Sequence, residues 1–159
     1  MVDRYHKGRV RPYAEAAALN VIDKRVAKLV EILNCEGVIY TRGSCQGHGF
    51  PFVRVPPYVS FKTSAAIALA FDTRLQQLYA SSVEKLHYCW RIKISIDDDG
   101  SLTYVLGIPD LSSGKLWYAL RYCIDRDFQL IGSAAQTLLQ LLNYQNSEVV
   151  SQVSQCNHT

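Results

Sequence analysis

A chain of 159 residues is long enough for one domain with a substantial hydrophobic core and too short for two such domains. With 48% hydrophobic and 19% charged residues, its composition is that of a globular protein and excludes a disordered chain. No apolar run approaches the roughly 18–20 residues that span a bilayer. The basic N-terminus also lacks the apolar centre of a signal peptide. We therefore expect a cytoplasmic protein without a membrane segment.

The net charge of +3 is concentrated at the N-terminus, because residues 1–11 contain four basic side chains and one acidic side chain. Such an arm is typical of a solvated terminus or of a contact with nucleic acid or an acidic partner. We predict a flexible arm over 1–11, a single domain over 12–145 and a polar tail over 146–159. The sequence does not indicate an oligomeric state.

Five cysteines are widely spaced and form no C-x-x-C pair, which does not fit a disulfide scaffold. We expect reduced thiols, with Cys89 and Cys123 as small buried core residues.

The first predicted helix spans 12–34, where apolar residues recur every three or four positions. The β-branched and aromatic run 38–41 then predicts a strand. A second strand is predicted over 58–63, followed by a helix over 64–86 with Thr63 or Ser64 as its N-cap.

Residues 87–96 alternate between apolar and polar side chains, "DDDG" supplies a turn, and 101–108 return as a partner strand. The alternation predicts one buried and one partly wet face. A third helix follows Ser112 or Ser113 and carries apolar residues along one face, namely Leu116, Leu120, Cys123 and Ile124.

The C-terminal part predicts a short strand at 127–131 and a last helix at 134–144, opened by a capping box of Ser133 and Gln136. The order of elements favours an α/β fold of the α+β type. We expect a two-layer sandwich with a mostly antiparallel or mixed sheet covered by helices.

The segment 41–52, "TRGSCQGHGFPF", is the main candidate site. Its G-x-C-x-G spelling at 43–47 is the cysteine form of a nucleophile elbow, with Cys45 and His48 as candidate catalytic residues. An elbow needs a helix directly after the nucleophile, and Pro51 with the later prolines prevents one. The sequence therefore gives the elbow weak support.

A zinc site is an alternative, because Cys45 and His48 lie close in sequence and His87 and Cys89 share one side of a predicted strand. Nothing in the spacing brings the two pairs together, so no metal site is predicted from it.

A third interpretation uses the backbone. Glycines allow positive φ and close approach, so consecutive N–H groups could form an anion-binding concavity. Arg42, Arg54 or Lys62 would add positive charge, and aromatic side chains would offer a surface for a ring. The predicted ligand-binding residues are Arg42, Gly43, Ser44, Cys45, Gln46, Gly47, His48 and Arg54.

The run "VIYTRGSCQGHG" and the later "PYVSFKT" resemble the S-C-x-G segment and following strand of the wybutosine-synthesising protein family. The S-C-x-G core falls on Ser44, Cys45 and Gly47, and "LRYCIDRDFQLIGS" is similar to a family segment in which a helix runs into a strand. The resemblance implies modification of a tRNA guanosine with S-adenosylmethionine. Arg42, Gly43 and His48 depart from the family's pattern, and a shared fold does not bring the activity with it.

These observations lead to a ligand-binding domain for an anionic small molecule or a nucleotide- or RNA-like ligand at the glycine-rich loop 42–54. The alternatives are a protein-interaction module without a small-molecule site, and a cysteine-dependent or S-adenosylmethionine-dependent RNA-modifying enzyme. The sequence leaves the identity of any cofactor open.

Overall fold

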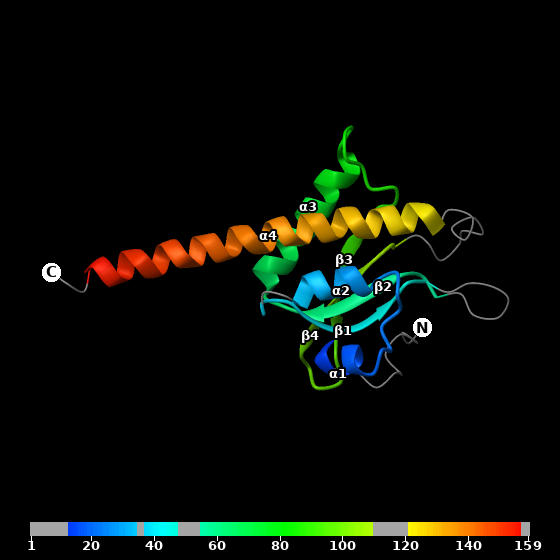
Figure 1. Ribbon diagram of the computed structural model, residues 1–159, viewed down its shortest axis with the longest axis horizontal. Helices are drawn as coiled ribbons and strands as arrows, with labels where there is room; N and C mark the ends of the chain where they lie inside the picture. The colour runs from blue at the N-terminus through cyan, green and yellow to red at the C-terminus, as the bar shows by residue number, and fades with distance from the viewer. Residues whose placement is uncertain (1–12, 35–36, 48–54, 110–120, 157–159) are drawn as a thin grey trace.

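The computed structural model describes residues 13–34, 37–47, 55–109 and 121–156. Four strands, β1 (Tyr40–Cys45), β2 (Tyr58–Lys62), β3 (Arg91–Ile96) and β4 (Leu102–Gly107), form one antiparallel sheet in the order β1-β2-β4-β3. The described helices are α1 (Tyr13–Ala18), α2 (Ala27–Asn34), α3 (Ala65–Ala80) and α4 (Arg121–Cys156). The predicted α+β sandwich with an antiparallel sheet is confirmed (Figure 1).

The core lies between the sheet and the helices α2, α3 and α4. Paired residues of neighbouring strands share a face, so Val59 lies beside Leu106 and Phe61 beside Tyr104. These four side chains are buried, and the rings of Phe61 and Tyr104 stack with centroids 6.0 Å apart. The helices contribute aliphatic and aromatic residues that are almost fully buried: Leu29, Leu33, Phe71, Leu75, Ile124 and Ile131.

The single helix predicted over 12–34 is wrong, because the chain forms α1 and α2 with a break between them. Asn20 adopts φ of 51°, and its N–H bonds the carbonyl of Ala17 while the N–H of Val21 bonds that of Ala16. This is the Schellman arrangement, in which a left-handed residue ends a helix. The apolar spacing continues past Asn20, so periodicity alone did not reveal the end of the helix.

Helix α3 begins where it was predicted, since the Ser64 side chain accepts a hydrogen bond from the N–H of Ile67. It ends at Ala80, six residues before the predicted end. From its buried face Asp72 reaches β3, where it accepts hydrogen bonds from Arg91 Nε (3.1 Å), Arg91 Nη2 (3.0 Å) and the N–H of Ile92 (2.8 Å).

The β3–β4 hairpin is present, but β3 begins at Arg91, so 87–90 precede the strand. Its buried face is only partly as predicted: Trp90 is fully buried, whereas Ile94 and Ile96 are 65% and 71% exposed. β3 is an edge strand, and Ile94 borders a shallow hollow whose α3 wall includes the short side chains of Ala65 and Ala68. Cys89 and Cys123 are free thiols and half-buried rather than fully buried.

One helix of 36 residues, α4, replaces the elements predicted for the C-terminal part. The strand at 127–131 is wrong, as is the capping box, because Ser133 lies in the middle of α4. The helix also continues to Cys156, through most of the predicted tail. Its buried stripe explains this, since the buried residues recur at helical spacing: Ile124, Phe128, Ile131, Ala135 and Leu139. Leu116 and Leu120 lie outside the described residues.

Asp127 of α4 is fully buried and holds the segment before β3. Its carboxylate accepts hydrogen bonds from the N–H of His87 (2.7 Å), the N–H of Tyr88 (3.0 Å) and Trp90 Nε1 (2.7 Å). Burial raises the pKa of this carboxyl, while the three donors act to lower it. Together, Asp72 and Asp127 connect two helices to the beginning of β3.

Nowhere in the described part of the chain does a helix combine the length and the apolar character that a membrane span requires.

We expect the Asp127→Asn variant to be less stable than the parent by about 1–3 kcal/mol, because an amide has one acceptor oxygen and leaves at least one buried donor without a partner. Urea unfolding followed by circular dichroism measures the difference. Asp98→Asn, at an exposed position of the hairpin turn, is the matched control and should unfold like the parent. Equal stability of all three proteins would contradict the role of Asp127.

Because the pKa of Asp72 is lowered in the folded state, we expect this residue to make the free energy of unfolding depend on pH. Burial acts to raise its pKa, but the hydrogen bonds from Arg91 and Ile92 outweigh burial and leave the pKa below its ordinary value. A lowered pKa in the folded state gives stability that is present above the unfolded-state value of about 3.9 and is lost as pH falls through the folded-state value. The free-energy difference between the parent and Asp72→Asn should therefore be largest near neutral pH and shrink below about pH 4. A difference that grew on acidification would contradict this assignment.

Candidate functional site

The first four predicted site residues lie in a strand rather than in a loop. β1 extends to Cys45, whereas the sequence predicted a strand over 38–41 and an irregular loop from 42 onward. The pairing with β2 shifts between Thr41 and Gly43, since Thr41 lies opposite Phe61 and Gly43 opposite Ser60. Arg42 is therefore the extra residue of a β-bulge, which is a common way to redirect a side chain at the edge of a sheet.

Arg42 is directed to an acidic residue at the β3–β4 turn. Its Nη1 lies 3.3 Å from Asp97 Oδ2, and Lys62 Nζ lies 3.6 Å from the same oxygen. Thr103 Oγ1 also donates to that oxygen at 2.8 Å, and Lys62 Nζ donates to Ser101 Oγ at 2.6 Å. We call these five residues the Asp97 cluster; in it two cations share one carboxylate.

A small cleft of about 160 Å³ adjoins β1 on the side of α1. Thr41, Arg42, Gly43 and Ser44 form its β1 wall. The opposite walls come from α1, from the segment that leads to α2 and from α2 itself: Tyr13, Ala16, Val21, Ile22 and Val30. Three of the predicted ligand-binding residues thus line one concavity, together with an aromatic ring.

Two glycines of the segment have different roles. Gly47 has φ of 86°, in the left-handed region that favours glycine. Gly43 does not have positive φ; instead, a Cβ added there would lie 3.1 Å from Ser60 Oγ, the hydroxyl that donates to the Gly43 carbonyl at 3.2 Å. Gly43 therefore allows close approach of β1 and β2, and Gly47 allows the chain to turn after β1.

Asn34 at the end of α2 fixes the beginning of β1. Its amide nitrogen donates to Thr41 Oγ1 at 2.7 Å, and its amide oxygen accepts from the N–H of Thr41 at 3.1 Å. At the other end, the N–H of Gln46 donates to Asp23 Oδ2 at 3.0 Å, and Gln46 Oε1 accepts from the N–H of Arg25 at 3.3 Å. The β1 wall of the cleft is thus held at both ends.

Cys45 is the last residue of β1 and is only 6% exposed. Its sulfur accepts a hydrogen bond from the N–H of Gly47 at 3.4 Å. A buried thiol behaves as a small apolar residue, whereas reactive cysteines are partly exposed. The burial of Cys45 gives no support to a nucleophile elbow.

His48 and Arg54, the remaining predicted site residues, lie outside the described residues. His87 and Cys89, the other half of the possible zinc set, precede β3 at the opposite edge of the sheet from β1. Across four strands these edges are roughly 14 Å apart, too far for a shared zinc ion. Within the described residues, no three potential ligands are close enough to hold a metal.

The sequence did not identify two residues of the candidate site, Tyr13 and Asp97. Tyr13 was one residue of a predicted helix, and Asp97 was one acid of the "DDDG" turn. Neither carries a local signal of a site, because each meets β1 only through the tertiary structure. Lys62 was recognised as a possible source of charge near the segment.

Comparison of the chain with protein-family models, curated proteins and solved structures gave no significant match in any of the three.

We expect a thiol reagent at neutral pH to modify Cys45 more slowly than Cys89 and Cys123, because Cys45 is buried and the other two are half-buried. Peptide mass spectrometry over a time course gives the three rates in one sample, so Cys89 and Cys123 serve as internal controls. Preferential labelling of Cys45 would reveal a reactive thiol and would support the nucleophile elbow.

Proposed function

We propose that the chain binds a small anionic or nucleotide-like ligand, including the phosphate groups of RNA, in the cleft beside β1. The observation that carries the proposal is the cleft itself, because Arg42, Gly43 and Ser44 line one concavity together with Tyr13. Sequence reasoning selected the same three residues for anion binding on independent grounds.

The volume of the cleft limits what enters it. At about 160 Å³ it is smaller than the roughly 300–1,000 Å³ of sites that enclose a drug-sized ligand. A phosphate or carboxylate group fits such a space, whereas a whole nucleotide does not. The rest of the ligand would then lie on the surface outside the cleft.

Charge for the ligand comes from Arg42. Its side chain is 28% exposed and its partner Asp97 is 19% exposed, so the pair is in contact with solvent. An incoming phosphate that offers two charged oxygens competes favourably for the guanidinium. Asp97 keeps Lys62 and Thr103 as partners when Arg42 turns to a ligand, so no buried charge is left unpaired.

Aromatic side chains supply a surface for a base or another ring. Tyr13 lines the cleft, and Tyr40, at the start of β1, is 59% exposed. Base–aromatic stacking contributes about 1–3 kcal/mol per base and tolerates any sequence. The combination favours a phosphate-bearing ligand with a ring over a simple inorganic anion.

We expect Arg42→Ala to weaken binding about tenfold or more, because a hydrogen bond to a charged group contributes about 1.5–3 kcal/mol. The probes are inorganic phosphate, a nucleoside monophosphate and a short single-stranded RNA, titrated by calorimetry or fluorescence anisotropy. Their relative affinities separate simple anion binding from recognition of a nucleotide or of RNA.

Arg126→Ala, which removes an exposed arginine from α4, changes the net charge equally and should bind like the parent. Equal binding of every probe by Arg42→Ala and Arg126→Ala would refute the site. A loss shared by both variants would indicate a non-specific charge effect, which is also contrary to the proposal.

A further inference from the structure

The outer edge of β3 carries backbone groups that the sheet does not use. In an antiparallel pair, successive residues direct their N–H and C=O groups alternately toward the partner strand and away from it. The N–H of Asp97 donates to the carbonyl of Ser101, across the turn that leads to β4. Counting back from this pair, Ile92, Ile94 and Ile96 direct their backbone groups away from β4. The outer edge of the sheet thus presents the backbone of three isoleucines.

Helix α3 already uses one end of this edge. The N–H of Ile92 donates to Asp72 of α3 at 2.8 Å, and the Arg91 side chain donates to the same carboxylate. Among the described residues, no acceptor receives the N–H of Ile94 or of Ile96, and no donor reaches their carbonyls. Both backbone groups of each of these two residues are therefore available to a further strand, which is a common mode of protein recognition.

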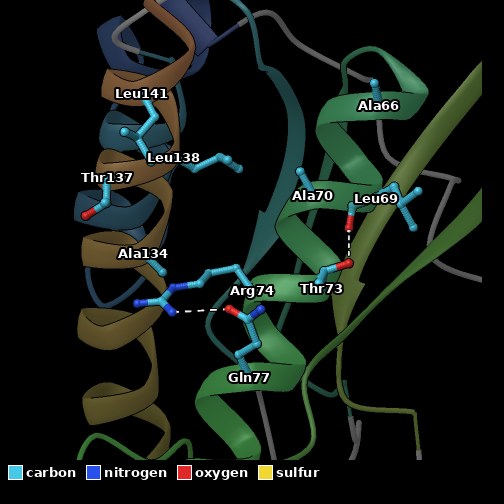
Figure 2. A pocket seen from close by; sticks show the side chains of 10 residues that line it. All are labelled: Ala66, Leu69, Ala70, Thr73, Arg74, Gln77, Ala134, Thr137, Leu138 and Leu141. Atoms are coloured by element: carbon cyan, nitrogen blue, oxygen red, sulfur yellow. Dashed lines mark hydrogen bonds between the residues drawn. The ribbon is translucent and has the colours of Figure 1, made fainter. Parts of the chain in front are cut away.

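Apolar side chains adjoin the available backbone. Ile94 and Ile96 are exposed, and the hollow of about 150 Å³ beside Ile94 is lined on its α3 side by Ala65, Ala68 and Leu69. Leu69 is itself exposed and also lines the larger groove of about 610 Å³ between α3 and α4, so the apolar surface continues from β3 across α3 (Figure 2). A continuous apolar surface of this kind is typical of a protein–protein contact.

The charges along β3 indicate which strand fits this edge. Arg91 and Lys93 lie in its first half, and the three aspartates 97–99 follow its end. An antiparallel partner places its end beside the beginning of β3, so a second copy of β3 brings acidic residues to basic residues. Facing residues of opposite charge stabilise an antiparallel pair, whereas facing residues of like charge destabilise it. The strand is thus complementary to itself.

We propose that two copies of the chain form a two-fold symmetric dimer in which their β3 strands pair antiparallel about Ser95 and join the two sheets into one. In this register Ile94 of each copy lies opposite Ile96 of the other, and their available N–H and C=O groups bond one another. Lys93 of each copy lies opposite Asp97 of the other. The interface is isologous, as in most homodimers, and the proposal does not rest on the ligand site.

Neighbouring registers use the edge less completely. A register centred on Ile94 pairs Ile92 with Ile96 and needs the N–H that Ile92 gives to Asp72. A register centred on Ile96 places Ile94 opposite Asp98, which lies in the turn after β3. Only the register centred on Ser95 pairs the available groups of the strand with one another.

Both members of the charge pair are able to take a partner from a second copy. Lys93 is exposed and makes no ion pair with a described residue. The contacts of Asp97 with Arg42, Lys62 and Thr103 all fall on Oδ2. Among the described residues none contacts Asp97 Oδ1, so this oxygen can accept a hydrogen bond from Lys93 without loss of the existing contacts.

The first experiment measures the mass of the full chain by light scattering and its dissociation by sedimentation. The parent should be a dimer and Ile96→Pro a monomer, because proline lacks the N–H that bonds the second copy. That N–H does not face β4, so Ile96→Pro should keep the parent's circular dichroism spectrum. Ile96→Val retains the N–H and an apolar side chain, and as the matched control it should remain a dimer.

The charge pair is tested by Lys93→Asp, which should raise the dissociation constant about tenfold or more because it places two aspartates opposite each other in both halves of the interface. Lys93→Arg keeps the positive charge and should dissociate like the parent. These variants do not depend on the tolerance of β3 for proline.

The register is tested by a cysteine at the two-fold axis. The Ser95 pair is not hydrogen-bonded, so its Cα atoms are about 4.5 Å apart, within the roughly 4.4–6.8 Å that a disulfide spans. Ser95→Cys should therefore form a disulfide-linked dimer on mild oxidation, seen on a non-reducing gel. The Lys93 positions of the two copies are about 14 Å apart along the strands, so Lys93→Cys should not link, and the parent gives the background from the native thiols.

A parent that stays monomeric at every concentration would overturn the proposal. So would a folded Ile96→Pro that dissociates like the parent, or equal dissociation constants for Lys93→Asp and Lys93→Arg. Equal linking of Ser95→Cys and Lys93→Cys, or no linking of Ser95→Cys, would overturn the register.

Discussion

The position of β3 depends on two carboxylates that belong to different helices. Asp127 accepts three hydrogen bonds from residues 87–90, and Asp72 accepts three from Arg91 and Ile92. Burying a carboxylate is costly, and only such a complete set of donors offsets the loss of hydration. β3 pairs with β4, and β4 pairs with β2, so the placement of this segment extends through the sheet. Directional polar contacts, in addition to the apolar core, determine how the helices lie on the strands.

Much of the fold was predictable because its signals are local. The Ser64 cap, the β3–β4 hairpin and the turn at 97–100 each depend on residues close in sequence, and each is present in the structure. The errors share a different cause. Residues 127–131 suit a strand by local preference, but the stripe from Ile124 to Leu139 buries its side chains only as a helix. The end of α1 at Asn20 was missed because asparagine is a rarer left-handed terminator than glycine.

In the candidate site too, the residues adjacent in sequence were predicted, whereas those brought in by the tertiary structure were not. Arg42, Gly43 and Ser44 were selected together because they are consecutive, and consecutive residues remain neighbours in any fold. Their partners were not predictable, since Asp97 reaches Arg42 through the order of the strands and Tyr13 reaches the cleft through the packing of α1 on β1. The bulge at Arg42 leaves no clear mark in the sequence, although it decides where the guanidinium is directed.

The two edge strands of the sheet, β1 and β3, differ in how accessible they are to pairing with a strand of another chain. α1 packs against β1, and Tyr13 and Ala16 of α1 line the cleft opposite the β1 residues. β3 is the other edge strand of the sheet, and it carries two exposed isoleucines, Ile94 and Ile96. Unprotected apolar edges are templates for strand addition and aggregation. Lys93 stands beside them as an exposed charge, and the three aspartates of the adjoining turn place further charge at the end of the strand. Charges beside an apolar edge strand oppose the addition of a further strand whose charges do not match, so Lys93 and the turn act against unselective edge pairing although they contribute nothing to the core.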